Sequence, residues 1–212
     1  MIKSVLNGVK IASVAAAIYA TSFSLASADY LSDIAKIPSG NYAIEKTHAS
    51  LTFKVNHIGL SFYTARFTDI KADVNLNSAD VEKSSVNAEV KLKSVKTDYP
   101  FPKKENFDAE IAKKFFNAKK YPVASFVSKS IKKTGANTGV ITGDLTMHGQ
   151  TQTIVLDAVF NGGYDAHPYT KNPAFGISAK TKIKRSQWGI NEYIPYVGDE
   201  VELALELEFV KK

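Results

Sequence analysis

The side chains that could carry acid–base or metal chemistry in this 212-residue chain are its four histidines and 21 acidic residues. The histidines, at 48, 57, 148 and 167, lack the His-x-x-x-His and His-Glu-x-x-His spacings, so we predict no metal centre. Cysteine is absent, which excludes disulfides and thiolate nucleophiles. The chain has no nucleophile elbow, phosphate loop or dinucleotide motif, and its acidic residues mostly alternate with apolar ones. We therefore predict no catalytic residue and a protein that is not an enzyme.

One of these histidines and two further side chains are candidates for contacts at the mouth of a binding cavity. His57 ends an alternating apolar stretch, and imidazole titrates near neutral pH, so it suits a headgroup donor or a proton relay. A plain structural hydrogen bond is an equally good interpretation of His57. Arg185 and Trp188 either frame such a mouth or hold the end of the folded unit together, and we favour the structural role for both.

The elements that position these residues are β-strands, because apolar and polar residues alternate along most of the chain. Successive side chains of a strand point to opposite faces, so each stretch has one apolar and one wet face. Turn residues such as Gly162-Gly163 and Gly198-Asp199 separate the stretches. The pattern predicts an all-β protein, as a sandwich or a closed barrel. The alternating stretches are residues 51–56, 70–76, 86–93, 141–147, 154–160, 177–184 and 201–209.

One segment has helical spacing instead. Phe107, Ile111 and Phe115 recur every four residues within 105–117, which predicts an inserted amphipathic helix of about three turns. Acidic residues near its start and lysines near its end suit the helix dipole. Pro122 prevents continuation beyond Tyr121.

The first 28 residues have the pattern of a cleavable signal peptide. Lys3 and Lys10 precede a short apolar run, and Ala26-Ser27-Ala28 forms an A-x-A cleavage site. We predict cleavage after Ala28, a periplasmic protein and one mature domain, residues 29–212, that does not span a membrane. Removing the two lysines lowers the formal charge from +6 to +4, and the remaining lysines are scattered, so we predict no nucleic-acid partner.

Several motifs, in order over the mature chain, resemble the YceI-like family of exported polyisoprenoid-binding proteins. The strand entry Ala65-Arg66-Phe67 departs from the family's G-x-F, and Phe107-Asp108-Ala109-Glu110-Ile111 replaces its basic R-D-x-H-L. The matching stretches are residues 42–50 (YAIEKTHAS), 51–59 (LTFKVNHIG), 114–117 (KFFN), 121–128 (YPVASFVS), 142–151 (TGDLTMHGQT), 184–189 (KRSQWG) and 197–201 (VGDEV).

The resemblance implies an extended antiparallel eight-stranded lipocalin-like barrel with a long apolar tunnel. It also implies a carrier of an isoprenoid or quinone-like lipid, with some family members linked to quinone or cytochrome b systems and others to stress survival. Apolar walls suffice to bind a long tail, because each buried methylene contributes about 0.8 kcal/mol. No further cofactor is expected. The wall candidates are Phe53, Val55, Phe67, Val90, Leu92, Phe126, Leu145, Met147, Leu156, Phe175, Leu203 and Leu205.

Two other functions stay open from the sequence. One is an enzyme acting on such a lipid through His57 or another buried polar group. The other is a stress-related interaction protein with a filled core. A homodimer formed through an exposed strand or helix is compatible with the sequence.

Overall fold

The computed structural model describes residues 29–212, so the predicted signal peptide lies outside the described residues. Within this range the chain is mostly β-strand, with one α-helix and four short 3-10 turns at Ile34–Lys36, Val81–Lys83, Leu92–Ser94 and Arg185–Trp188. The longer elements are β1 (Tyr30–Leu31), β2 (Gly40–His57), β3 (Ser61–Phe67), β4 (Ile70–Leu76), β5 (Ser85–Lys91), β6 (Val95–Lys96), α1 (Phe107–Lys114), β7 (Val123–Lys133), β8 (Thr138–Met147), β9 (Gln150–Tyr164), β10 (Ala174–Lys184) and β11 (Val197–Lys211).

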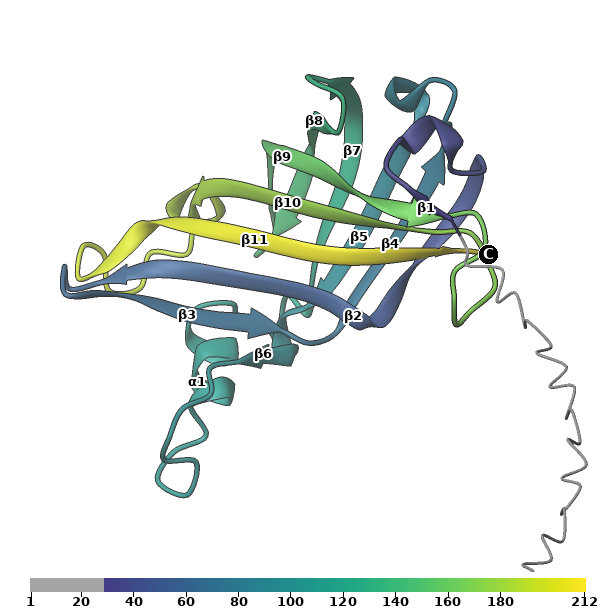
Figure 1. The fold of residues 1–212 in the computed structure, drawn as a ribbon. Coiled ribbons are helices and arrows are strands. Elements are labelled where there is room, and N and C mark those ends of the chain that lie inside the picture. Colours follow the sequence, from purple (N-terminus) through teal and green to yellow (C-terminus); the bar gives the residue numbers. More distant parts are fainter. Residues whose placement is uncertain (1–28) are drawn as a thin grey trace, which may run out of the picture.

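Eight antiparallel strands of the described chain close into a barrel (Figure 1). Their order is β11-β10-β9-β8-β7-β5-β4-β2, and β11 pairs with β2 to complete the ring. The closing register runs from Val197 opposite His57 to Lys211 opposite Tyr42. Closure leaves no unpaired edge in the ring, because every strand has a neighbour on both sides. The eight-stranded barrel predicted from the sequence is therefore confirmed.

β2 is long because it pairs with β11 on one side and with two strands in succession on the other. Its first residues, Gly40–Ala43, pair with β4, and Leu51–His57 pair with β3. Between these two halves β2 contains a bulge, because the advance of five residues from Ile44 to Ala49 lies opposite an advance of only two residues on β11. Such a bulge bends a strand. The Glu45 carboxylate stabilises it by accepting from the backbone N–H groups of Thr47 and His48, and the Thr47 hydroxyl hydrogen bond lowers the pKa of Glu45.

α1 packs against β6 and the 3-10 turn Leu92–Ser94, outside the ring of eight strands, and its Phe107 ring lies beside Tyr63 of β3 (Figure 1). It is eight residues long, so the predicted three turns are an overestimate. Asn106 caps the start of the helix, because its side chain accepts a hydrogen bond from the Ala109 N–H at 3.1 Å. The helix ends at Lys114, and Asn117 then has a positive φ of 43°, a conformation that does not continue a helix. No helix within residues 29–212 is long and apolar enough to cross a bilayer.

Candidate functional site

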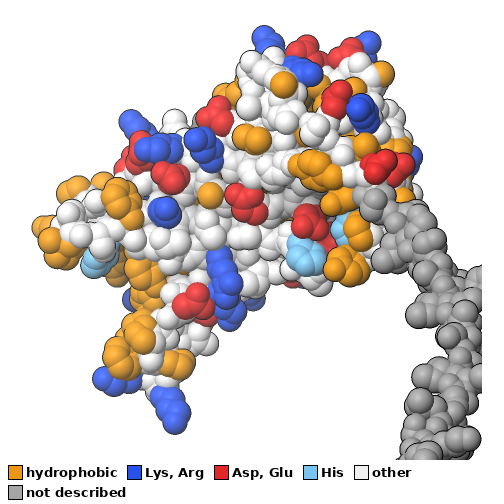
Figure 2. All heavy atoms as spheres, in the orientation of Figure 1, with side chains coloured by type: hydrophobic (Ala, Val, Ile, Leu, Met, Phe, Trp, Pro, Cys, Tyr) orange, Lys and Arg blue, Asp and Glu red, His pale blue; other side chains and the backbone are white. Residues whose placement is uncertain are grey.

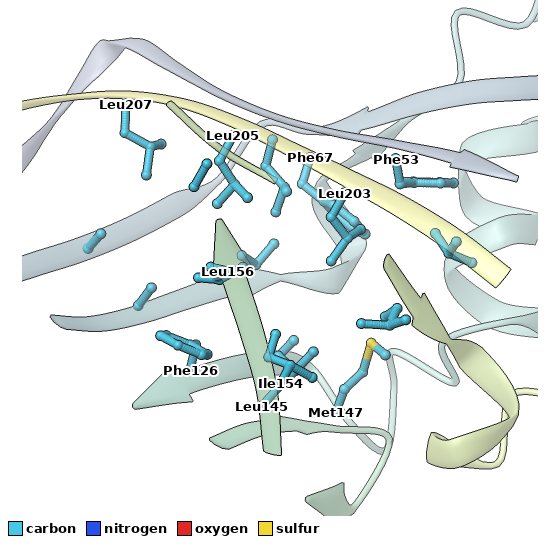
Figure 3. Close-up of a pocket in the computed structure, with 18 of the residues that line it drawn as sticks. Phe53, Phe67, Phe126, Leu145, Met147, Ile154, Leu156, Leu203, Leu205 and Leu207 are labelled. Carbon is cyan, nitrogen blue, oxygen red and sulfur yellow. The ribbon is translucent and has the colours of Figure 1, made fainter. Parts of the chain in front are cut away.

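The barrel encloses an elongated cavity of about 690 Å³. It is lined by the apolar stripes of the strands, and all twelve wall residues predicted from the sequence lie along it. Figure 3 shows Phe53, Phe126, Leu145, Leu156 and Leu205 among the side chains that converge on this space from opposite strands. Ile154 and Leu207, absent from the prediction, line the same space.

Incomplete burial of inward-facing side chains shows that the interior is hollow. An apolar side chain pointing into a filled core would be almost fully buried. On three strands the stripe residues that line the cavity are only half-buried, while the alternating residues on the other face are mostly exposed. The hollow interior therefore does not support the alternative of an interaction protein with a filled core. The half-buried residues are Val86, Ala88 and Val90 on β5, Ile154, Leu156 and Ala158 on β9, and Leu203, Leu205 and Leu207 on β11.

Charged side chains line the cavity only near its ends. One end lies beside α1, where Glu110, Lys114 and the exposed His57 take part in the lining. The other end lies near the β7–β8 turn, where Lys132 and Lys133 do so. The stretch between them is lined mostly by aliphatic and aromatic residues. This arrangement suits a molecule with a long apolar tail, because the tail needs few polar partners.

Aromatic side chains of α1 and its flanks wall the first end. Phe116 packs against Phe67 with ring centroids 5.5 Å apart, and against Phe53 at 6.5 Å. Phe115 lies 5.9 Å from Tyr193 in the loop before β11. The helix segment predicted from its four-residue spacing therefore forms one side of the cavity mouth.

Asp108 anchors this helix, a role that the four-residue spacing of the segment does not predict. Its carboxylate accepts from the Thr97 N–H at 2.8 Å, from the Thr97 hydroxyl at 2.6 Å and from Lys96 Nζ at 3.0 Å. Burial raises the pKa of Asp108, but the hydrogen bonds from Thr97 and Lys96 outweigh it and leave the pKa below its ordinary value. Asp108 occupies the aspartate position of the family's R-D-x-H-L run, and the chain departs from that run at its neighbours Phe107 and Glu110. The Asp108 carboxylate ties α1 to β6.

Arg185 lines the cavity, but its guanidinium hydrogen bonds go to backbone carbonyls. Its guanidinium donates to the carbonyls of Gly198, Ile190, Glu192 and Val197 at 2.8–2.9 Å. The side chain is 4% exposed, and this burial lowers its pKa. The guanidinium also lies 5.7 Å from the centroid of the Phe115 ring. Arg185 therefore holds the loop that frames the mouth, which agrees with the structural role favoured for it.

Trp188 does not reach the mouth, which agrees with the structural role favoured for it over a headgroup contact. The side chain is fully buried and is not part of the cavity lining. Its indole N–H donates to the Leu145 carbonyl at 3.0 Å, because a buried indole needs an acceptor. Trp188 thus ties the 3-10 turn after β10 to β8.

The fold and cavity define a class of protein: a closed antiparallel barrel whose hollow interior is lined by apolar side chains. The YceI-like domain family matches residues 42–209, and the chain belongs to that family. A UPF0312 protein of Pseudomonas savastanoi pv. phaseolicola is 37% identical over 178 residues, covering 82% of this chain and 88% of that protein.

Solved structures have the same fold. The YceI protein of Campylobacter jejuni is 29% identical with a TM-score of 0.62, covering 75% of this chain and 91% of that one. BcnA of Burkholderia cenocepacia is 20% identical with a TM-score of 0.66, over 78% and 98% of the two chains. A domain described as polyisoprenoid-binding, from Saccharophagus degradans, is 14% identical with a TM-score of 0.59, over 81% and 98%. At these last two identities the likeness bears on fold alone.

Proposed function

We propose that the protein is a periplasmic carrier that holds the tail of a long-chain isoprenoid or quinone-like lipid inside its barrel. The observation that carries the proposal is the apolar cavity of about 690 Å³, with charged side chains only near its ends. The description of the Saccharophagus degradans domain as polyisoprenoid-binding supports the ligand class. The signal-peptide pattern of residues 1–28 supports the location.

The physical basis is transfer of a hydrocarbon tail from water to matched apolar walls. Each methylene buried contributes about 0.8 kcal/mol, so a long tail alone provides a large part of the affinity. The polar head would lie at an end of the cavity, near groups such as His57 or Lys132. A membrane quinone or cytochrome b system is a candidate source of such a lipid, through the family resemblance.

Native mass spectrometry tests the proposal. Residues 29–212, stripped of lipid with organic solvent and incubated with octaprenol or a long-tailed quinone, should carry one lipid molecule per chain. The absence of any lipid-bound mass with both ligands would contradict a carrier.

The same spectra separate a carrier from an enzyme acting on the lipid. A carrier returns the lipid with its mass unchanged. A changed lipid mass with the wild type, but not with His57→Ala, would favour the enzyme. His57→Ala suits this comparison because His57 lines the cavity, yet its side chain makes no hydrogen bond to another described residue whose loss would disturb the fold.

A further inference from the structure

Exposed apolar side chains gather at the α1 end of the barrel. Among the described residues twelve large hydrophobic side chains are exposed, and six of them lie in residues 58–62 and 193–196. We call these two segments the rim; they are joined by a 2.7 Å hydrogen bond from the Ile58 N–H to the Tyr196 carbonyl. Leu60 is 82% exposed and Phe62 68%. The hairpin between β2 and β3 projects at one end of the molecule, and Figure 2 shows hydrophobic side chains gathered there.

The rim is continuous with the cavity. Ile58, Tyr193 and Tyr196 are exposed to solvent, and the same three residues take part in the cavity lining. An apolar surface therefore runs from the interior of the barrel to its outside without a charged barrier at these positions. Isolated exposed apolar residues need no explanation, but a contiguous group beside a cavity marks an interaction site.

A row of aromatic rings extends from the mouth to a third exposed segment, residues 99–104. Tyr63 packs 6.3 Å from Phe107, Phe107 5.1 Å from Tyr99, and Tyr99 5.9 Å from Phe101. Lys104 Nζ lies 4.9 Å from the centroid of the exposed Phe101 ring. In Figure 2 the projecting part of the molecule ends in lysine or arginine side chains beside hydrophobic ones.

The charges of these segments have one sign. The rim and residues 99–104 contain Lys103 and Lys104 and no acidic residue. Tyrosines and lysines next to apolar side chains are typical of protein surfaces at the membrane interface. Lysines of this kind are attracted to anionic headgroups. The complementary partner is a negatively charged surface that also accepts apolar side chains.

We infer that the rim and residues 99–104 dock on an anionic lipid bilayer, with Leu60 and Phe62 inserted among the lipids. This inference rests on the proposed function and adds the route: the tail enters the barrel across an apolar surface without crossing water. Docking places the mouth formed by Ile58, Tyr193 and Tyr196 against the bilayer.

Vesicle flotation tests the docking. The protein used is residues 29–212, which contain the whole closed barrel and lack the apolar leader that would bind vesicles by itself. The wild type should bind phosphatidylglycerol-containing vesicles better than pure phosphatidylcholine vesicles. L60S/F62S should lower the partition coefficient for both vesicles by roughly tenfold or more. K103Q/K104Q should lose roughly tenfold on the anionic vesicles only.

V155S/V159S is the matched control. It removes the same kind of exposed apolar surface, 48% and 42% exposed, from β9, and should bind as the wild type does. Vesicle binding by L60S/F62S equal to that of the wild type would overturn the inference, and so would an equal loss in the control. A wild-type dimer that L60S/F62S dissociates, seen by light scattering without vesicles, would assign the rim to a second copy of the chain and overturn it too.

Lipid loading without vesicles keeps the two proposals separate. Leu60 and Phe62 do not line the cavity, so L60S/F62S should take up octaprenol added from ethanol as well as the wild type does. If neither the wild type nor any variant took up octaprenol, the carrier proposal would be rejected. The docking inference would then be decided by the vesicle flotation result. Normal loading without vesicle binding would reject the docking alone.

Discussion

A chain carrying Ala88→Trp and Ala158→Trp is expected to bind octaprenol roughly a hundredfold more weakly than the wild type. Both alanines line the cavity, on β5 and β9, and both are half-buried because they face empty space. Two indoles there would displace part of the tail. Losing four buried methylenes costs about 3 kcal/mol, which is roughly a hundredfold in affinity. The measurement is a titration of delipidated protein followed by intrinsic fluorescence or calorimetry.

The control for this variant is Val159→Trp. Val159 neighbours Ala158 on β9 but lies on the outer face and is 42% exposed, so its replacement should leave affinity unchanged. Thermal unfolding by circular dichroism checks that the double variant is folded. If the folded double variant bound octaprenol as tightly as the wild type, the tail would have to bind outside the barrel.

Arg185→Met is expected to lower the free energy of unfolding by about 3–5 kcal/mol. The substitution leaves four backbone carbonyls without their donor: those of Ile190, Glu192, Val197 and Gly198. Arg185→Lys should recover only part of the loss, because an ammonium group cannot reproduce the planar fork of donors. Urea unfolding measures the change, and hydrogen exchange should increase first in residues 190–198.

Arg66→Met is the matched control for Arg185, since these are the two arginines of the chain. Arg66 is 54% exposed on its side chain and makes one ion pair, with Asp98 at 3.8 Å. Removing such a surface pair costs about 1 kcal/mol or less. Equal effects of the two substitutions would mean that the mouth loop is held by contacts other than the guanidinium.

Alternation along the chain was enough to predict most of the barrel strands. The stretch 70–76 coincides with β4, and the stretches near 154–160 and 201–209 lie inside the longer β9 and β11. β3 was missed because Phe62, an apolar residue, occupies its outer face and hides the period of two. That same residue belongs to the surface that we assign to the bilayer.

Closure and hollowness could not be predicted from periodicity. A sandwich and a barrel need the same alternation, and the difference rests on the pairing of β11 with β2, strands more than 130 residues apart. Small residues on the inner stripes are equally compatible with a filled core. In the structure Ala88 and Ala158 line a cavity, and neither is fully buried.

The mouth was the least predictable part of the site. Contacts between residues that are not neighbours in the sequence determine the structure of the mouth. Asp108 accepts hydrogen bonds from Thr97, eleven positions earlier, and Trp188 donates to the Leu145 carbonyl. Neither spacing belongs to a local pattern, so the sequence does not predict the helix anchor and leaves the mouth open as an alternative position for Trp188. The family motif singles out Arg185, and only the structure shows that backbone carbonyls accept its hydrogen bonds.

The central claim is that the barrel interior binds an apolar tail, and a series of prenols of increasing length tests it most directly. Prenols lengthen by five-carbon isoprene units, and each unit added should raise the affinity for delipidated protein by roughly a hundredfold or more, with one prenol per chain, until the tail fills the cavity. The increase should then level off, because further carbons stay in water. Affinity that is independent of tail length, or no binding of any prenol, would contradict the claim.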